Sequence, residues 1–212
     1  MPLTLTTPPV SEPVPLLETK SFLRVTNSEQ DDVITAMTKA ARIYTEQLSG
    51  LQLMPATWTY TDHAFGRQRN QDFRLIYLDV YPINSITAFT YRDVNNTVQS
   101  LTASDYILKS SPRPYVYPSY PNRRWPSLVD DNYFYEDSLS ITLDCGYADA
   151  DSVPEELKLA IKLITKFWYE NRSEITVVGK AATDKGPGDQ FVPAPFSARE
   201  IIMSYSNSPN PA

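Results

Sequence analysis

The sequence predicts an α+β protein, in which a helical body carries an inserted small antiparallel β-sheet or sandwich. Apolar residues recur every three to four positions near both ends of the chain, which is typical of amphipathic helices. Between residues 55 and 147, short runs of β-formers alternate and are separated by turn residues, which indicates antiparallel strands. The 212 residues include 18 prolines but only 6 glycines, and this favours edge strands and stiff extended segments.

The N-terminal part is expected to be an extended arm followed by helices. Residues 1–13 hold four prolines and little else that could pack, which predicts the arm. Residues 14–50 should form the N-terminal helices. A short helix is expected from Pro15 to Leu23, because proline is accepted in a first turn. A long helix should follow over residues 29–49, with acidic residues at its start and Gly50 at its end.

A second long helix is expected over residues 153–172, where Pro154 and two glutamates mark the start. Its apolar stripe and that of the helix over 29–49 both need cover, so the two helices should pack on each other. The stripe of the first helix consists of Val33, Ile34, Met37, Ala40, Ala41, Tyr44 and Leu48. The expected helix-packing core consists of Val33, Met37, Tyr44, Leu157, Ile161, Ile164 and Trp168.

The region 55–147 is expected to be the β-rich insertion. Its candidate strands are 57–61, 74–78, 86–91, 97–101, 105–108, 115–117 and 138–144. Residues 112–135 interrupt them with a long proline- and tyrosine-rich excursion that should be irregular. Tyr, Trp and Arg dominate interface hot spots, so the excursion is interpreted as an assembly interface. Its candidate residues are Tyr117, Tyr120, Arg123, Arg124 and Trp125. The alternatives are packing onto the sheet and a carbohydrate platform.

Composition excludes several classes of function. The only histidine, His63, is expected in a solvated loop, so a Ser-His-Asp triad and a His-rich metal site are both excluded. The single cysteine, Cys145, is expected as a buried hydrophobe on a strand and suits a reducing compartment. The net charge of −6 argues against tight DNA binding. No apolar run is long enough to span a membrane, and no secretion signal is expected. We therefore expect no enzyme, cofactor or metal.

Several segments together resemble the head-to-tail connector, or portal adaptor, family of tailed bacteriophages. The resemblance covers about residues 14–205 and depends on the order and spacing of its parts. These parts are Leu16–Val25, Asp31-Asp32, Ala40-Ala41-Arg42, Glu46, Gly50, Trp58, Tyr81–Ile86, Tyr91-Arg92-Asp93, Tyr106, Trp125-Pro126, Gly146-Tyr147, Val153–Lys158, Ile161, Trp168–Arg172 and Val192–Phe196. The excursion 112–135 and the turn residues Asn95-Asn96 depart from the family pattern.

The resemblance implies a structural protein of the virion neck, made and assembled in the host bacterial cytoplasm. Such proteins form a ring, commonly of 12 copies, beneath the portal protein. The ring extends the channel through which double-stranded DNA passes without specific binding, and it carries the next component, a stopper or tail terminator. Within residues 180–212, a polar linker should lead to a portal-docking segment. Its expected contacts are Val192, Pro195, Phe196, Ile201, Ile202 and Tyr205.

Three alternatives remain open at the level of the sequence. The C-terminal segment, with a short helix over residues 197–204, could fold back on its own subunit instead of docking on the portal. The protein could be a different neck component, either a stopper or a tail-completion protein. A carbohydrate-binding β module would also account for the aromatic cluster.

Overall fold

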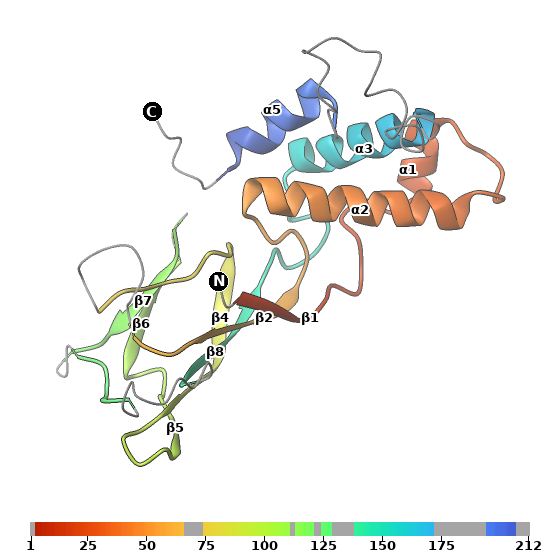
Figure 1. Cartoon of the computed structure of the whole chain (residues 1–212). Coiled ribbons are helices and arrows are strands. Elements are labelled where there is room, and N and C mark those ends of the chain that lie inside the picture. The colour runs from red at the N-terminus through yellow and green to blue at the C-terminus, as the bar shows by residue number, and fades with distance from the viewer. Residues whose placement is uncertain are drawn as a thin grey trace, which may run out of the picture. The chain divides into compact units, whose positions relative to one another are not determined.

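The computed structural model describes residues 3–65, 74–110, 113–120, 124–128, 138–171 and 194–206. The chain divides into two compact units (Figure 1). The β unit comprises Met1–Val10 and Gly50–Ala148, and the helical unit comprises Ser11–Ser49 and Asp149–Ala212. The described residues form four helices and two antiparallel sheets, which confirms the predicted α+β class.

The helical unit contains α1 (Leu16–Leu23), α2 (Asp31–Ser49), α3 (Glu155–Glu170) and α5 (Phe196–Ser204). Helix α3 packs against α2 and α5, and α1 packs against α2 and α3. None of the described helices is long and apolar enough to cross a membrane.

Prolines and positive-φ residues set the bounds of these helices. Pro15, Pro154 and Pro195 stand immediately before α1, α3 and α5, where a missing N–H costs nothing. Helix α2 ends at Gly50, whose φ of 71° is the left-handed conformation that glycine adopts without strain. Arg24 closes α1 in the same conformation, with a φ of 58°.

The core of the helical unit lies between α2, α3 and α5. Leu157, Ala160, Ile161 and Ile164 form the buried stripe of α3, with one residue every three to four positions. Further buried apolar side chains come from the rest of the unit: Val14, Ile34, Ala41, Val153, Ala194, Ala198 and Ile202.

The β unit contains a five-stranded sheet with the order β1-β2-β8-β4-β5. A three-stranded sheet has the order β3-β7-β6. All the pairings between the described strands are antiparallel. The strands are β1 (Leu3–Thr7), β2 (Ala56–Asp62), β3 (Ile76–Tyr77), β4 (Ile83–Arg92), β5 (Val98–Ser100), β6 (Tyr106–Lys109), β7 (Tyr115–Pro118) and β8 (Leu139–Cys145).

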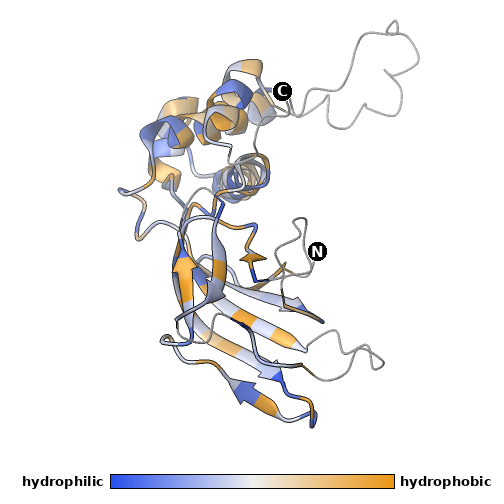
Figure 2. Ribbon diagram, turned by 90° about the vertical axis from the view of Figure 1, so that its left-hand side faces the viewer, coloured by the Kyte–Doolittle hydropathy of each residue, from blue (hydrophilic) through white to orange (hydrophobic). Residues whose placement is uncertain are grey.

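Strict alternation of buried and half-buried side chains positions the central strand β8. Leu139, Ile141, Leu143 and Cys145 are buried, while the residues between them are half-buried. Figure 2 shows hydrophobic and hydrophilic residues alternating along the strands of the β unit. Ile76 and Val116 of the smaller sheet belong to the same hydrophobic cluster, so the two sheets share one core. Burial, together with the charge of Asp144, raises the pKa of the Cys145 thiol to about 12. The thiol therefore stays protonated, and Cys145 acts as a small hydrophobe.

The N-terminal arm pairs with the larger sheet, which the sequence analysis did not predict. Residues 1–13 were expected to have little that could pack, but Leu3–Thr7 form the edge strand β1 of the larger sheet. Leu3 lies opposite Tyr60 of β2 and packs against the hydrophobic core. The paired segments are more than fifty residues apart, so the local sequence pattern does not predict the pairing.

Within the excursion 112–135, the candidate strand over residues 115–117 is confirmed. Residues Tyr115–Pro118 form β7, the central strand of the smaller sheet. The structure does not describe residues 111–112, 121–123 and 129–137, so the rest of the excursion is described only in part.

Gly146 follows β8 at a place where the chain passes very close to another backbone segment. Its φ is 109°, and a Cβ atom built there would lie 2.3 Å from the carbonyl oxygen of Met54. The amide of Asn84 donates a hydrogen bond to the carbonyl of Gly146 (2.9 Å). Only glycine fits this crossing without displacing backbone.

Candidate assembly surfaces

Helix α2 buries a mostly polar face and leaves much of its apolar face exposed. The side chains buried in the subunit are Ile34, Thr38, Ala41, Arg42, Thr45 and Ser49. Val33, expected in the helix-packing core, is 41% exposed, and Ile43 is 40% exposed. Met37 and Tyr44, from the same expected core, are half-buried. The assignment of Val33 to the core was therefore wrong, because the helix is rotated so that its polar side faces the other helices.

The buried polar side chains of α2 are satisfied within the helical unit. The hydroxyls of Thr38, Thr45 and Ser49 donate to carbonyls four residues earlier, at 2.8 Å in each case. Arg42, only 3% exposed, donates to Glu12 (Nε–Oε2, 2.7 Å) and to Glu46 (Nη1–Oε2, 2.6 Å). This arrangement lets the polar face be buried without orphaned groups.

The charges around Arg42 keep its guanidinium ionised. Burial lowers the pKa of Arg42, but the hydrogen bonds and negative charges of Glu12 and Glu46 outweigh it, so the pKa is raised overall. Glu12 lies in the segment that connects β1 to α1. The ion pairs therefore hold this connecting segment against α2.

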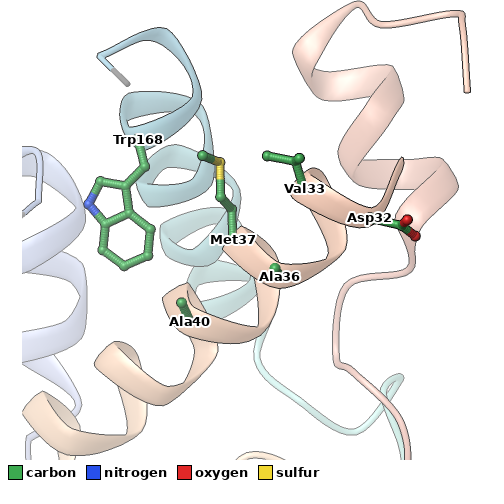
Figure 3. Close-up of a pocket in the computed structure, with 6 residues that line it drawn as sticks. All are labelled: Asp32, Val33, Ala36, Met37, Ala40 and Trp168. Atoms are coloured by element: carbon green, nitrogen blue, oxygen red, sulfur yellow. The ribbon is translucent and has the colours of Figure 1, made fainter. Parts of the chain in front are cut away.

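The exposed apolar side of α2 forms an open groove with α3. The groove has a volume of about 480 Å³ and is lined by Asp32, Val33, Ala36, Met37, Ala40 and Trp168. In Figure 3, the side chain of Met37 rises from α2 beside the indole of Trp168, and Val33 lies beyond Met37. Asp32 is at the far end, with its carboxylate pointing away from the indole. Five of the six lining residues are apolar. Such a hollow is suited to an apolar side chain from another molecule.

Trp168, also expected in the helix-packing core, forms one wall of the groove and is only half-buried. Its ring meets Tyr44 of α2 edge to face, with centroids 6.2 Å apart and planes at 73°. The hydroxyl of Tyr169, the next residue of α3, donates to Gln30, which directly precedes α2 (2.7 Å). These contacts fix the wall of the groove to α2, so the hollow is preformed in the subunit.

A second candidate surface is the outer face of the smaller sheet. Tyr115 and Tyr117 are half-buried and alternate with the buried residues Val116 and Pro118 of β7. Cross-strand register places three more residues on the same face as these two tyrosines: Tyr77 and Lys109 lie opposite Tyr115, and Ile107 lies opposite Tyr117. The rings of Tyr77 and Tyr115 are 5.8 Å apart, and those of Tyr115 and Tyr117 are 6.0 Å apart. We call Tyr77, Tyr115, Tyr117, Ile107 and Lys109 the tyrosine face.

The structure separates the residues expected in the assembly interface. Tyr117 lies on the tyrosine face, Tyr120 is 77% exposed, and Arg124 is exposed. Trp125 instead stacks on Phe65 (centroids 4.9 Å apart, planes at 5°) and packs against the core. Its indole N–H also donates to the carbonyl of Arg74 (2.8 Å). The expectation that Trp125 would be an interface residue is corrected, because its ring and its polar atom are both engaged within the β unit. Arg123 lies outside the described residues.

The residues expected to dock on the portal are likewise separated by the fold of α5. Ile202 is fully buried, together with Ala198, on the side of α5 that packs on α3. Phe196 is 76% exposed, whereas Pro195, Ile201 and Tyr205 are half-buried. The hydroxyl of Tyr205 donates to Glu156 of α3 (3.0 Å). Helix α5 thus folds back on its own unit, and Ile202 is not available to a partner. Val192 lies outside the described residues, as does the linker 180–190.

One polar cluster was not foreseen from the sequence. Tyr60 donates its hydroxyl hydrogen bond to Asp62 (2.8 Å), and Nδ1 of His63 lies 2.9 Å from the other oxygen of the same carboxylate. Burial and the neighbouring Asp62 raise the pKa of Tyr60, which keeps the phenol protonated. The alternation of Tyr60 and Asp62 along β2 places both on one face and is the signal that could have found the pair. The cluster closes the end of β2.

The described residues thus present two candidate surfaces, an apolar groove on the helical unit and the tyrosine face on the β unit. The chain belongs to the head completion protein family, whose model matches residues 16–208. The resemblance to phage head-to-tail connectors that the sequence indicated is thereby confirmed. No curated protein matches the chain.

Three similar solved structures come from gene transfer agent (GTA) particles. The neck of an empty particle computed with C6 symmetry contains a chain of 18% identity and a TM-score of 0.72. The virion of a native particle gives 18% identity and a TM-score of 0.71. The neck of a native particle computed with C12 symmetry gives 16% identity and a TM-score of 0.69. Each match covers 97% of this chain and 95% of the other. The common fold therefore extends over both units.

Proposed function

We propose that this protein is a structural component of the neck of a phage or phage-like particle, where it assembles as a ring of about 12 copies that joins the head to the tail. The observation that carries the proposal is the orientation of α2, which buries Thr38, Arg42 and Thr45 but exposes Val33 and Ile43. A subunit that works alone gains nothing from exposing this stripe. A subunit that is covered by neighbours in a ring gains apolar burial there.

Family and fold support the same proposal. The head completion family covers nearly the whole chain, and the similar chains come from particle necks computed with sixfold and twelvefold symmetry. In the adaptor version of this function, the ring sits beneath the portal protein and extends the DNA channel. The net charge of −6 on each chain suits such a channel, because a negatively charged ring would repel the DNA phosphates and would not retain the DNA as it passes.

For contact with the portal we propose the exposed side of α5, with Phe196 as its main side chain. Because α5 packs on its own unit, the portal interface that we propose contains fewer residues than the sequence predicted, and it leaves out the buried Ile202. The tyrosine face is the corresponding surface for the next neck or tail component. Its three half-buried rings offer amphipathic contact area at low cost in side-chain entropy.

Negative-stain microscopy and native mass spectrometry of the purified protein, alone and with its portal, test this proposal. An adaptor should form closed rings that bind portal, and Phe196→Ser should weaken portal binding while Ser197→Ala, its exposed neighbour, should not. Rings that bind the tail side but never the portal would identify a stopper instead. A monomer that joins neither component would refute the neck function.

The carbohydrate-binding alternative now has less support. Its strongest feature was the aromatic cluster, but Trp125 stacks on Phe65 inside the β unit. Binding of the monomer to glycans, with no assembly, would restore that alternative.

A further inference from the structure

We propose that the groove between α2 and α3 receives helix α1 of the neighbouring copy, with Leu17 entering the groove and Arg24 pairing with Asp32. This inference rests on the proposed function, because it names the contact by which the ring would close. The contact joins α1 of one copy to the groove of the next copy, so each subunit uses two different surfaces. A heterologous contact of this kind is what generates a closed ring of identical chains.

The exposed side of α1 carries an apolar and a basic side chain that would complement the apolar groove and Asp32. Leu17 is 80% exposed, the highest value for any large hydrophobic side chain on the described helices. Ser21 follows four positions later on the same face and is also exposed, and Arg24, the exposed residue that caps the C-terminus of α1, comes directly after the helix. The opposite side of α1 is held to its own subunit through buried Thr19 and through the Lys20–Asp31 ion pair (2.6 Å).

The spacing of apolar and charged groups matches on the two surfaces. Leu17 and Arg24 are seven residues apart, or about 10 Å along the helix. Asp32 and Ala40, at the two ends of the groove, are eight residues apart, or about 12 Å. With α1 antiparallel to the α2 of its neighbour, Leu17 lies over Met37 and Ala40, and Arg24 reaches Asp32.

Charge complementarity selects this occupant. Among the described residues that line the groove, only Asp32 is charged, so a suitable partner carries a basic group at that end and an apolar group at the other. Arg24 and Asp32 are both exposed, and neither forms an ion pair with another described residue. Contact between copies would therefore join two opposite charges without breaking an ion pair among the described residues.

Charge reversal tests the pairing in the full-length protein. Arg24→Glu and Asp32→Arg should each raise the subunit concentration needed for half-maximal ring formation by about tenfold or more. The double variant should restore most of the loss, because the pair is rebuilt with the charges exchanged. Arg24→Lys is the matched control, and thermal melts verify that each subunit is folded. Rings that form equally well in all the variants would overturn the inference.

Cross-linking tests the position of Leu17 independently of charge. The chain with Leu17→Cys and Ala40→Cys, treated with a short bismaleimide, should give covalent oligomers up to the full ring, because the proposed contact brings the two new thiols of neighbouring copies together. The native Cys145 is buried and should not react. The control combines Leu17→Cys with Leu159→Cys. Leu159 is nine residues from Trp168, half a turn around α3 from the groove wall.

The remaining outcomes separate the other occupants. Rings without covalent oligomers overturn the inference but leave the proposed function standing. Linkage of Ala40→Cys to a portal subunit overturns it by assigning the groove to the portal. If a maleimide label fails to reach Ala40→Cys in the monomer, the chain's own residues fill the groove and the inference is again overturned. If no rings form even with portal present, both proposals fail.

Discussion

The buried ion-pair cluster around Arg42 gives a sharp prediction about stability. Replacing Arg42 by Met keeps a similar length of side chain but removes the charge that both carboxylates share. Glu12 and Glu46 have side chains only 23% and 14% exposed, so each would keep a negative charge with little access to water. Removal of one partner from a buried pair typically costs about 3–5 kcal/mol. Because both carboxylates retain some exposure, we expect about 3 kcal/mol for Arg42→Met.

That cost should be measurable as a fall in Tm. For a chain of this size, each kcal/mol shifts Tm by about 2–4 °C, so the variant should melt roughly 6–12 °C below the parent. Differential scanning calorimetry of the full-length protein measures the shift, and urea unfolding gives the free energy independently. Arg199→Met, at an exposed position on α5, is the matched control and should change the free energy of unfolding by less than about 0.5 kcal/mol.

A compensated variant makes the reasoning refutable. Arg42→Met combined with Glu12→Gln and Glu46→Gln removes the stranded charges, so it should recover at least half of the lost stability. If Arg42→Met melts like the parent, the cluster is not buried as described. If the triple variant is less stable than the single one, the cost does not come from unpaired carboxylates.

Three further predictions concern other parts of the molecule. Gly146→Ala should lower the free energy of unfolding by more than about 2 kcal/mol, because both its positive φ and a nearby carbonyl oppose a Cβ; unchanged urea unfolding would contradict this. Trp168→Ala should lower the free energy of unfolding by about 1–2 kcal/mol, because Trp168 is only half-buried. Ile161→Ala should lower it by roughly 3–5 kcal/mol, because Ile161 is fully buried, and calorimetry of both variants checks that order. Replacing Tyr115 and Tyr117 by Ser should leave rings intact but weaken binding of the next neck or tail component; sedimentation with that component checks it, and loss of the rings themselves would contradict it.

Much of the fold could be predicted from sequence because the signals are local. The spacing of apolar residues predicted the long helices now seen as α2 and α3, and Gly50 marked the end of α2 as expected. Alternation along β8 predicted its strand and its buried face. Each of these signals lies within a dozen or so residues, where periodicity and turn chemistry act directly on the backbone.

The family resemblance came from the order of many weak motifs, and the head completion family confirms it. The candidate assembly surfaces were harder to predict. Periodicity shows which residues of a helix share a face, but it does not show which face its own subunit covers. In α2 the polar face is the buried one. Arg42 donates a hydrogen bond to Glu12, thirty residues earlier in the chain, and the hydroxyls of Thr38 and Thr45 donate to backbone carbonyls of their own helix.

The sequence by itself determined the α+β class, the positions of most helices and strands, and the kind of protein. The tertiary structure alone decided that Leu3–Thr7 join the sheet, that Trp125 turns inward, that Ile202 is buried and that Val33 lines an open groove. The physical reason is the same in each case. Those outcomes depend on contacts between residues distant in sequence, whose free energies are set by packing partners that local patterns do not specify.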